Sequence, residues 1–157
     1  MAKYAADTAV APEQSRAEIE RTLIRYGADR FLYGWEQGHA AIAFELDGRR
    51  MRFILPMPDR SAREFTHTPA RGVPRSPDAR EAAYNQAVRQ RWRALLLVIK
   101  AKLEAVDAGI STLEEEFLAA TVLPDNRTVG EWMLPQVERA YATHRMPPML
   151  PAPDDND

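Results

Sequence analysis

Two tight-turn signals within residues 30–55 constrain the fold of this chain more than any other feature of its sequence. Asp47-Gly48 is the stronger signal, because a two-residue type I′ hairpin needs positive φ at both central positions. Gln37-Gly38 is a weaker signal of the same kind. With both pairs taken as two-residue loops, the segment predicts a three-stranded antiparallel meander. Both turns assign the residues of the shared middle strand to the same buried and exposed faces, as a sheet with one buried face requires.

The register set by these turns sorts the meander into two faces. One face collects large apolar side chains, and we expect it to pack on the core: Phe31, Tyr33, Trp35, Ile42, Phe44, Leu46, Met51, Phe53 and Leu55. The other face collects small and charged residues: Leu32, Gly34, Glu36, His39, Ala41, Ala43, Glu45, Arg50, Arg52 and Ile54. Small residues permit close approach, so this second face is open to either a covering helix or a ligand.

A helix is expected before the meander. Ser15 and Glu18 are spaced as a capping box, in which a hydroxyl and a carboxylate satisfy free amides at a helix start. Gly27 suits the left-handed residue that ends a helix. These signals predict a helix over about 15–26, preceded by a flexible N-terminus over residues 1–14.

A long helix is expected after the meander. Ser76-Pro77 predicts its start, with proline at the first helical position, and Gly109 predicts its end near Ala108. Apolar residues recur at spacings of three and four along it: Tyr84, Val88, Trp92, Leu95, Ile99, Leu103 and Val106. This stripe is longer than a three-stranded sheet can cover. We therefore expect a homodimer through the long helix, unless the C-terminal helices fold back on it.

Two further capping boxes predict two C-terminal helices. Ser111 to Glu114 opens a short helix, and Thr128 to Glu131 opens a longer one. We expect both to complete the core of a single α+β domain over residues 15–145. Residues 56–79 form a long basic loop, which is either a solvated insertion or an arm that orders on a partner. Residues 146–157 form a proline-rich, acidic tail.

Charge is distributed unevenly along the chain, whose formal net charge is −2. Residues 49–102 hold thirteen Arg and Lys against four Asp and Glu, whereas residues 1–48 hold five against eight and residues 103–157 hold three against eleven. A basic block of this kind is typical of a surface for an anionic partner, most often nucleic acid. Alternatively, the block neutralises the acidic flanks within the fold.

The predicted nucleic-acid-binding residues are arginines of this block. On this hypothesis they form one continuous surface that contacts phosphates in a salt-sensitive way: Arg50, Arg52, Arg60, Arg63, Arg71, Arg75, Arg89 and Arg93. The competing interpretation is that a helix covers the second face of the sheet, while its arginines pair with Glu36 and Glu45 at the rim.

Recognisable catalytic machinery is missing from the sequence. Cysteine is absent, the three histidines form no spaced pair, and no glycine-rich phosphate loop occurs. We therefore predict a protein that is not an enzyme, with no metal site and no cofactor. The longest apolar run, Ala94–Ile99, is far too short to span a membrane, and the first residues lack the apolar core of a signal peptide. A cytoplasmic location is the expectation.

Two levels of resemblance bear on function. The order helix, three antiparallel strands, helix resembles the double-stranded RNA-binding domain and the core of single-strand annealing proteins, without the sequence motif of either. The stretch RQRWRALLLVIKAKLEAVDAGISTLEEEFLAATVLPDNRTVGEWMLPQVERAYATHRMPPMLP, together with the meander, resembles small proteins of tailed phages and prophages, a group that implies no particular activity. That resemblance implies a phage-derived protein acting inside a bacterium. The expected function is nucleic-acid binding in DNA metabolism or annealing; the alternative is a non-enzymatic inhibitor or adaptor that binds a host bacterial protein.

Overall fold

A computed structural model of the chain describes residues 5–146 and confirms the α+β class. The N-terminal half contains helix α1 (Pro12–Arg25) and strands β1 (Arg30–Glu36), β2 (His39–Leu46) and β3 (Arg49–Pro56). After β3 come helices α2 (Arg63–Thr66), α3 (Pro77–Asp107), α4 (Leu113–Glu116) and α5 (Val129–Thr143), with a 3-10 turn η1 (Leu118–Ala120) after α4. Residues 147–157, which hold most of the predicted acidic tail, lie outside the described part.

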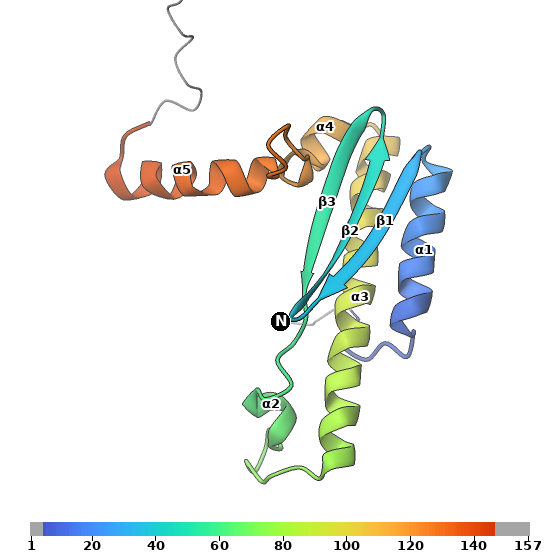
Figure 1. Ribbon diagram of the computed structural model, residues 1–157, viewed down its shortest axis with the longest axis vertical. Helices are drawn as coiled ribbons and strands as arrows, with labels where there is room; N and C mark the ends of the chain where they lie inside the picture. Colours follow the sequence, from blue (N-terminus) through green and yellow to red (C-terminus); the bar gives the residue numbers. More distant parts are fainter. Residues whose placement is uncertain (1–4, 147–157) are drawn as a thin grey trace, which may run out of the picture.

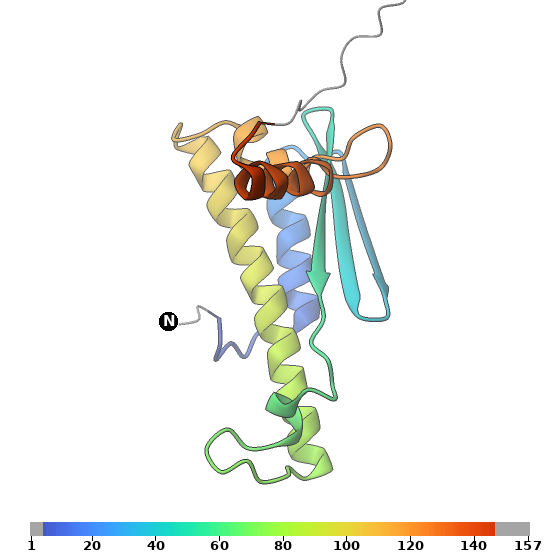
Figure 2. The ribbon, with the colours of Figure 1, turned by 90° about the vertical axis from the view of Figure 1, so that its left-hand side faces the viewer.

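The sheet has the predicted order and register. Strand β2 lies between β1 and β3, with Phe31 opposite Phe44 and Phe44 opposite Met51. At the second turn, Asp47 and Gly48 both adopt positive φ, at 52° and 71°, as a type I′ hairpin requires. Helices α1 and α3 lie side by side on one face of this sheet, so the domain has two layers (Figures 1 and 2).

The core lies between these two layers and is closed at one end by the segment after α3. Phe117, at the end of α4, is fully buried and packs edge-to-face on Phe44 and Phe53, with ring centroids 5.9 and 6.1 Å away. Helix α1 contributes Ile19 and Leu23, which are also fully buried. The apolar stripe of α3 supplies the rest of this layer: Trp92, Leu95, Leu96, Ile99 and Leu103 are all buried.

Helix α1 starts one turn earlier than the predicted capping box. Pro12 occupies the first turn, where its fixed φ suits a helix and its missing N–H costs nothing, so the helix starts there and the N-cap is Ala11. Ser15 therefore lies inside the helix and is fully buried. Residues 5–8, expected to be flexible, contact α3 instead: the side-chain amide of Gln86 donates to the carbonyls of Ala6 and Thr8, at 3.0 and 2.9 Å.

Glu18, expected to cap α1, instead joins α1 to α3. Its carboxylate accepts hydrogen bonds from Lys100 and from Arg93, the latter at 3.3 Å. The hydrogen bond from Lys100, aided by the charge of Arg93, lowers the pKa of Glu18 below its usual value of 4.5, against the opposing effect of burial. Two ion pairs that share Glu18 thus join α1 to α3, in addition to their apolar packing.

The Glu18 contact makes stability depend on pH in a defined direction. Because the folded-state pKa of Glu18 is depressed, its contribution is full above the unfolded pKa and is lost as pH falls through the folded pKa. We expect Glu18→Gln to lower the unfolding free energy near neutral pH by about 1 kcal/mol, since the three side chains are partly exposed. Urea titrations of both proteins should show the difference shrinking as the pH drops below 4, and a difference independent of pH would contradict the assignment.

The basic loop is folded rather than extended. Residues 57–76, which we call the arginine lobe, contain α2 and a short bridge between His67 and Pro74. Phe65 is buried and packs edge-to-face on Tyr84 of α3, with ring centroids 5.8 Å apart. Both views place the lobe at the end of the molecule opposite α4 and α5 (Figures 1 and 2). Contacts within the chain therefore give the lobe its fold.

The C-terminal helices differ from expectation in two ways. The capping box of α4 is Thr112 with Glu115, one residue later than predicted, whereas the box of Thr128 with Glu131 at α5 is as predicted. Helix α5 does not complete the core: none of its residues is buried, and it runs outward past β3 (Figure 1). Because most of the α3 stripe is buried within the chain, the reason for expecting a dimer through that helix disappears. No helix within residues 5–146 has the length and apolarity to cross a membrane.

Candidate nucleic-acid interface

The eight predicted arginines are distributed over both ends of the molecule. Arg50 and Arg52 lie on β3, beside the start of α5. Arg89 and Arg93 lie along the middle of α3. The other four are in the arginine lobe at the opposite end: Arg60, Arg63, Arg71 and Arg75. The fold therefore does not gather the eight guanidinium groups on one face.

Four of the eight pair with carboxylates of the same chain. Arg60 bonds Glu81, whose carboxylate raises the pKa of that guanidinium further, and Arg93 bonds Glu18. Arg50 lies 3.6 Å from Glu45, which was the rim pairing expected on the second sheet face. Other residues of the basic block do the same with the acidic flanks: Arg49 with Glu114, Lys100 with Glu18 and Lys102 with Glu116. This favours the interpretation that the block neutralises the flanks within the fold.

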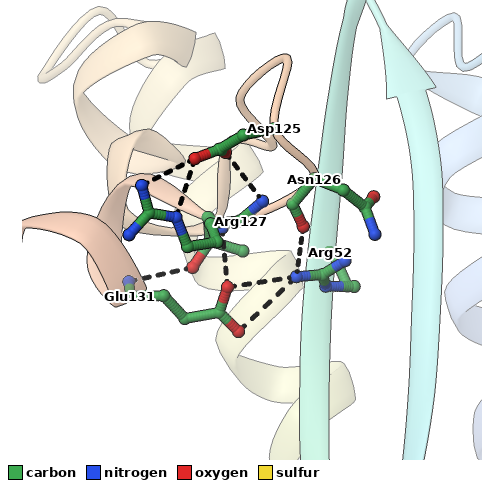
Figure 3. A network of polar contacts seen from close by, with 6 residues as sticks. Arg52, Asp125, Asn126, Arg127 and Glu131 are labelled. Atoms are coloured by element: carbon green, nitrogen blue, oxygen red, sulfur yellow. Dashed lines mark hydrogen bonds and ion pairs between the residues drawn. The ribbon is translucent and has the colours of Figure 1, made fainter.

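Arg52 belongs to a polar network that anchors α5 (Figure 3). Its guanidinium donates to the carbonyl of Asn126 at 3.0 Å and to the carboxylate of Glu131 at 3.1 Å. The same carboxylate accepts the backbone N–H of Thr128 at 2.8 Å, so it caps the helix as well. Asp125 accepts from the backbone and side chain of Arg127, which lowers the pKa of Asp125. The guanidinium of Arg52 therefore stabilises the turn before α5 rather than standing free for a ligand.

The remaining four predicted arginines have no carboxylate partner within the described residues. Arg89 donates to the side-chain carbonyl of Gln86 at 2.6 Å, and Arg75 donates to the carbonyl of His67 at 3.1 Å. Arg63 and Arg71 are exposed in the arginine lobe. These four keep a net positive charge that an anionic ligand can use, and three of them lie in the lobe.

A groove of about 420 Å³ lies between the start of α1, the β1–β2 hairpin and the N-terminal half of α3. Its size falls in the usual range of ligand sites. Four aromatic side chains line it, together with two arginines and two glutamates: Tyr33, Trp35, Tyr84, Trp92, Arg16, Arg89, Glu13 and Glu36. We call this the aromatic groove. It adjoins the arginine lobe, because Tyr84 contacts Phe65 of the lobe.

Two cation–π contacts hold the aromatic groove in shape. The guanidinium of Arg16 lies 4.2 Å from the ring centre of Tyr33, and that of Arg60 lies 3.9 Å from the ring centre of Tyr84. Trp35, in contrast, is 76% exposed and has no aromatic or cationic partner within the described residues. It presents a large, flat, apolar surface at the mouth of the groove.

Sequence reasoning assigned Tyr33 and Trp35 to the core. The register places them on the core side of the sheet, but they are 41% and 76% exposed. The reason is that this end of the sheet is not closed by packed side chains: Trp35 lies opposite Ala40, and the space beside it is the groove. The available signal was the position of Trp35 two residues before a turn, at the sheet end farthest from the buried phenylalanines.

Histidine and acidic side chains are dispersed over the described part of the chain. Residues 5–146 contain no cluster of three or more His, Asp and Glu side chains that could hold an ion. His39 lies 4.0 Å from Glu36, and Nδ1 of His67 lies 2.9 Å from the hydroxyl of Thr66. The prediction that the protein is not an enzyme stays a prediction.

Comparison with known proteins adds no assignment. No protein-family model matches the chain, and comparisons with curated proteins and with solved structures found no significant match.

Proposed function

We propose that the protein binds single-stranded nucleic acid, with bases stacked in the aromatic groove and the backbone held by nearby arginines. The observation that carries this proposal is Trp35, a 76% exposed indole at the mouth of a groove lined by three further aromatic rings. Stacking on an exposed aromatic side chain is worth about 1–3 kcal/mol per base and tolerates any sequence. Bases paired in a duplex do not offer their faces to such a platform, so single strands are the expected ligand.

The backbone contacts come from arginines that no carboxylate occupies. Arg89 lines the groove, and Arg63 and Arg71 are exposed in the adjoining lobe. Glu13 and Glu36 also line the groove, so its own charge is balanced. With about two to four phosphates neutralised, the slope of log affinity against log salt should lie at about −1.4 to −2.8. This is shallower than a continuous surface of eight arginines would give.

Trp35→Ala is expected to weaken binding of a short oligothymidine about 10- to 100-fold, because the stacking platform is lost. Fluorescence anisotropy of labelled single-stranded DNA, single-stranded RNA and duplex DNA at two salt concentrations measures this. Ile110→Ala is the control, since Ile110 is an 81% exposed apolar residue that lies after the end of α3 and has no part in the groove. Equal affinity of wild type and Trp35→Ala would exclude the groove as the site.

Two arginine variants separate the groove from the sheet face. Arg89→Ala should weaken binding and reduce the salt slope, whereas Arg50→Ala should change little, because Arg50 is engaged with Glu45. If Arg50→Ala proves the more damaging variant, the binding surface is the second sheet face. The proposal includes a setting, the cytoplasm of a bacterial host, and a role there in DNA metabolism.

The alternative function, an inhibitor or adaptor for a host bacterial protein, has one observation in its favour. Helix α5 projects from the domain with Leu134 60% exposed and Tyr141 79% exposed. Absence of any binding to single strands at low salt, together with specific capture of one host protein that Leu134→Asp abolishes, would favour this alternative.

A further inference from the structure

Helix α5 carries an apolar stripe that its own chain covers only in part: Leu134 and Tyr141 are exposed, whereas Met133, Val137 and Ala140 are partly buried. Five side chains recur on one side of the helix: Met133, Leu134, Val137, Ala140 and Tyr141. Gly130, at the start of the same side, meets η1 so closely that a Cβ there would lie 3.0 Å from the carbonyl oxygen of Ala119. Beyond that contact the helix leaves the domain, and none of its residues is buried (Figure 1).

The second face of the sheet is covered only at its β3 side, where Arg52 meets the turn before α5. Among the described residues no helix lies over it, since α1 and α3 both lie on the other face (Figures 1 and 2). Its central strand presents Ala41 and Ala43, and the flanking strands present Leu32, 66% exposed, and Ile54, 46% exposed. We call the strip of small side chains at Gly34, Ala41 and Ala43 the trough; Leu32 and Ile54 border it and, toward the second turn, so do the charged residues Glu45, Arg50 and Arg52.

The trough and the helix are complementary in shape and length. Small residues let a helix approach the sheet closely, and the large side chains of α5 fill the space above them. Helix α5 has 15 residues, so its length of about 22 Å matches the extent of eight-residue strands, about 27 Å.

The charges at one end of the trough also match the helix. Arg30 and Arg50 lie at 3.4 and 3.6 Å from the same carboxylate, that of Glu45, so one positive charge is in excess there. Glu138 lies on α5 between Leu134 and Tyr141, one turn from each. A helix docked in the trough with Glu138 at this end neutralises the excess charge.

Helix α5 is directed away from the trough of its own chain. The salt bridge between Arg52 and Glu131 fixes its first turn, and Thr121 and Val122 pair with the edge of β3 just before it. From there the helix runs outward past β3 (Figure 1). Each copy of the chain has one α5 helix and one trough that do not contact each other. Two copies can therefore pair each helix with the trough of the other copy.

We propose that two copies of this chain form a twofold dimer in which α5 of each lies in the sheet trough of the other. Both contacts are then identical, as closed twofold symmetry requires. The dimer uses neither the aromatic groove nor the arginine lobe, so it is independent of the proposed nucleic-acid site.

Two single variants test this arrangement. Leu134→Asp damages the helix, and Ala43→Arg damages the trough. Each places a charge at the contact, which should cost about 30-fold in affinity for one contact and about 1,000-fold for a dimer that repeats the contact twice. Wild type should show a concentration-dependent mass above 17.8 kDa in light scattering, and each variant should remain near 17.8 kDa. Circular dichroism checks that both variants fold, and Ile54→Glu replaces Ala43→Arg if that variant does not.

Mixing the two variants is the decisive experiment. The trough of the Leu134→Asp copy and the helix of the Ala43→Arg copy are both intact, so a mixed dimer keeps one undamaged contact and should form where neither variant alone dimerises. Native mass spectrometry detects it. A wild-type mass of 17.8 kDa at every concentration, a dimer that ignores both substitutions, or failure of the variants to pair would each overturn the proposal.

Discussion

Replacing Phe117 with alanine is expected to lower the unfolding free energy by about 3–5 kcal/mol. The side chain of Phe117 is 0% exposed and packs edge-to-face on Phe44 and Phe53. The nearby η1 turn and β3 cannot collapse into the vacated space, because Val122 donates to the carbonyl of Arg50 and fixes their spacing. Urea denaturation followed by circular dichroism measures the loss.

Leu118→Ala is the matched control for this prediction. Leu118 is the next residue in the chain and is 55% exposed, so its truncation should cost well under 1 kcal/mol. Similar losses for the two variants would mean that Phe117 does not close the core as described.

Phe65→Ala is expected to release the arginine lobe without unfolding the domain. Phe65 is 5% exposed and is the buried residue of α2, with its ring against Tyr84. Losing it should cost about 3 kcal/mol, but this loss falls on local opening of residues 57–76 rather than on the global transition. Four arginines in the lobe are trypsin sites, so cleavage there should become about 100-fold faster: Arg60, Arg63, Arg71 and Arg75.

The thermal midpoint should move little in the same variant, and this distinguishes local from global unfolding. Val73→Ala truncates a 51% exposed side chain of the lobe that does not directly follow an arginine, and it should leave both cleavage and midpoint unchanged. A large fall in the midpoint of Phe65→Ala would show that the lobe belongs to the cooperative core.

The meander could be predicted in detail because its determinants are local. Two turn dipeptides and a period of two set every strand pairing, and the observed partners of Phe44 and of Ile42 are the predicted ones. The bounds of the long helix could also be predicted from local signals. The hydroxyl of Ser76 accepts a hydrogen bond from the backbone N–H of Ala79, and Gly109 adopts a φ of 71° just past the helix end.

The predicted start of α1 was wrong because two local signals competed. The spacing of Ser15 and Glu18 is that of a capping box, yet Pro12 starts the helix a turn earlier. Glu18 then finds stronger partners in Lys100 and Arg93, about 80 residues later in the chain. No pattern within a short window contains information about such distant partners.

The candidate site was less predictable than the fold for the same reason. Composition identifies the basic block, but the ion pairs of Arg52 with Glu131 and Arg60 with Glu81 depend on which elements meet in space. The aromatic groove is assembled from three separate elements, and its exposed member, Trp35, follows the alternation of a core strand. Periodicity gives the direction of a side chain, but not whether anything lies above it.

The distance along the chain between α1 and α3 has a consequence for synthesis on the ribosome. The meander pairs only neighbouring strands, so it can form as soon as residue 56 has emerged. Ile19, Leu23 and the phenylalanine face of the sheet, however, are not fully covered until residues 92–103 of α3 arrive. For the time needed to translate about fifty residues, the nascent chain therefore exposes its future core. The Arg-rich segment that separates β3 from α3 lengthens this interval and at the same time places charge beside the exposed apolar surface, which opposes aggregation.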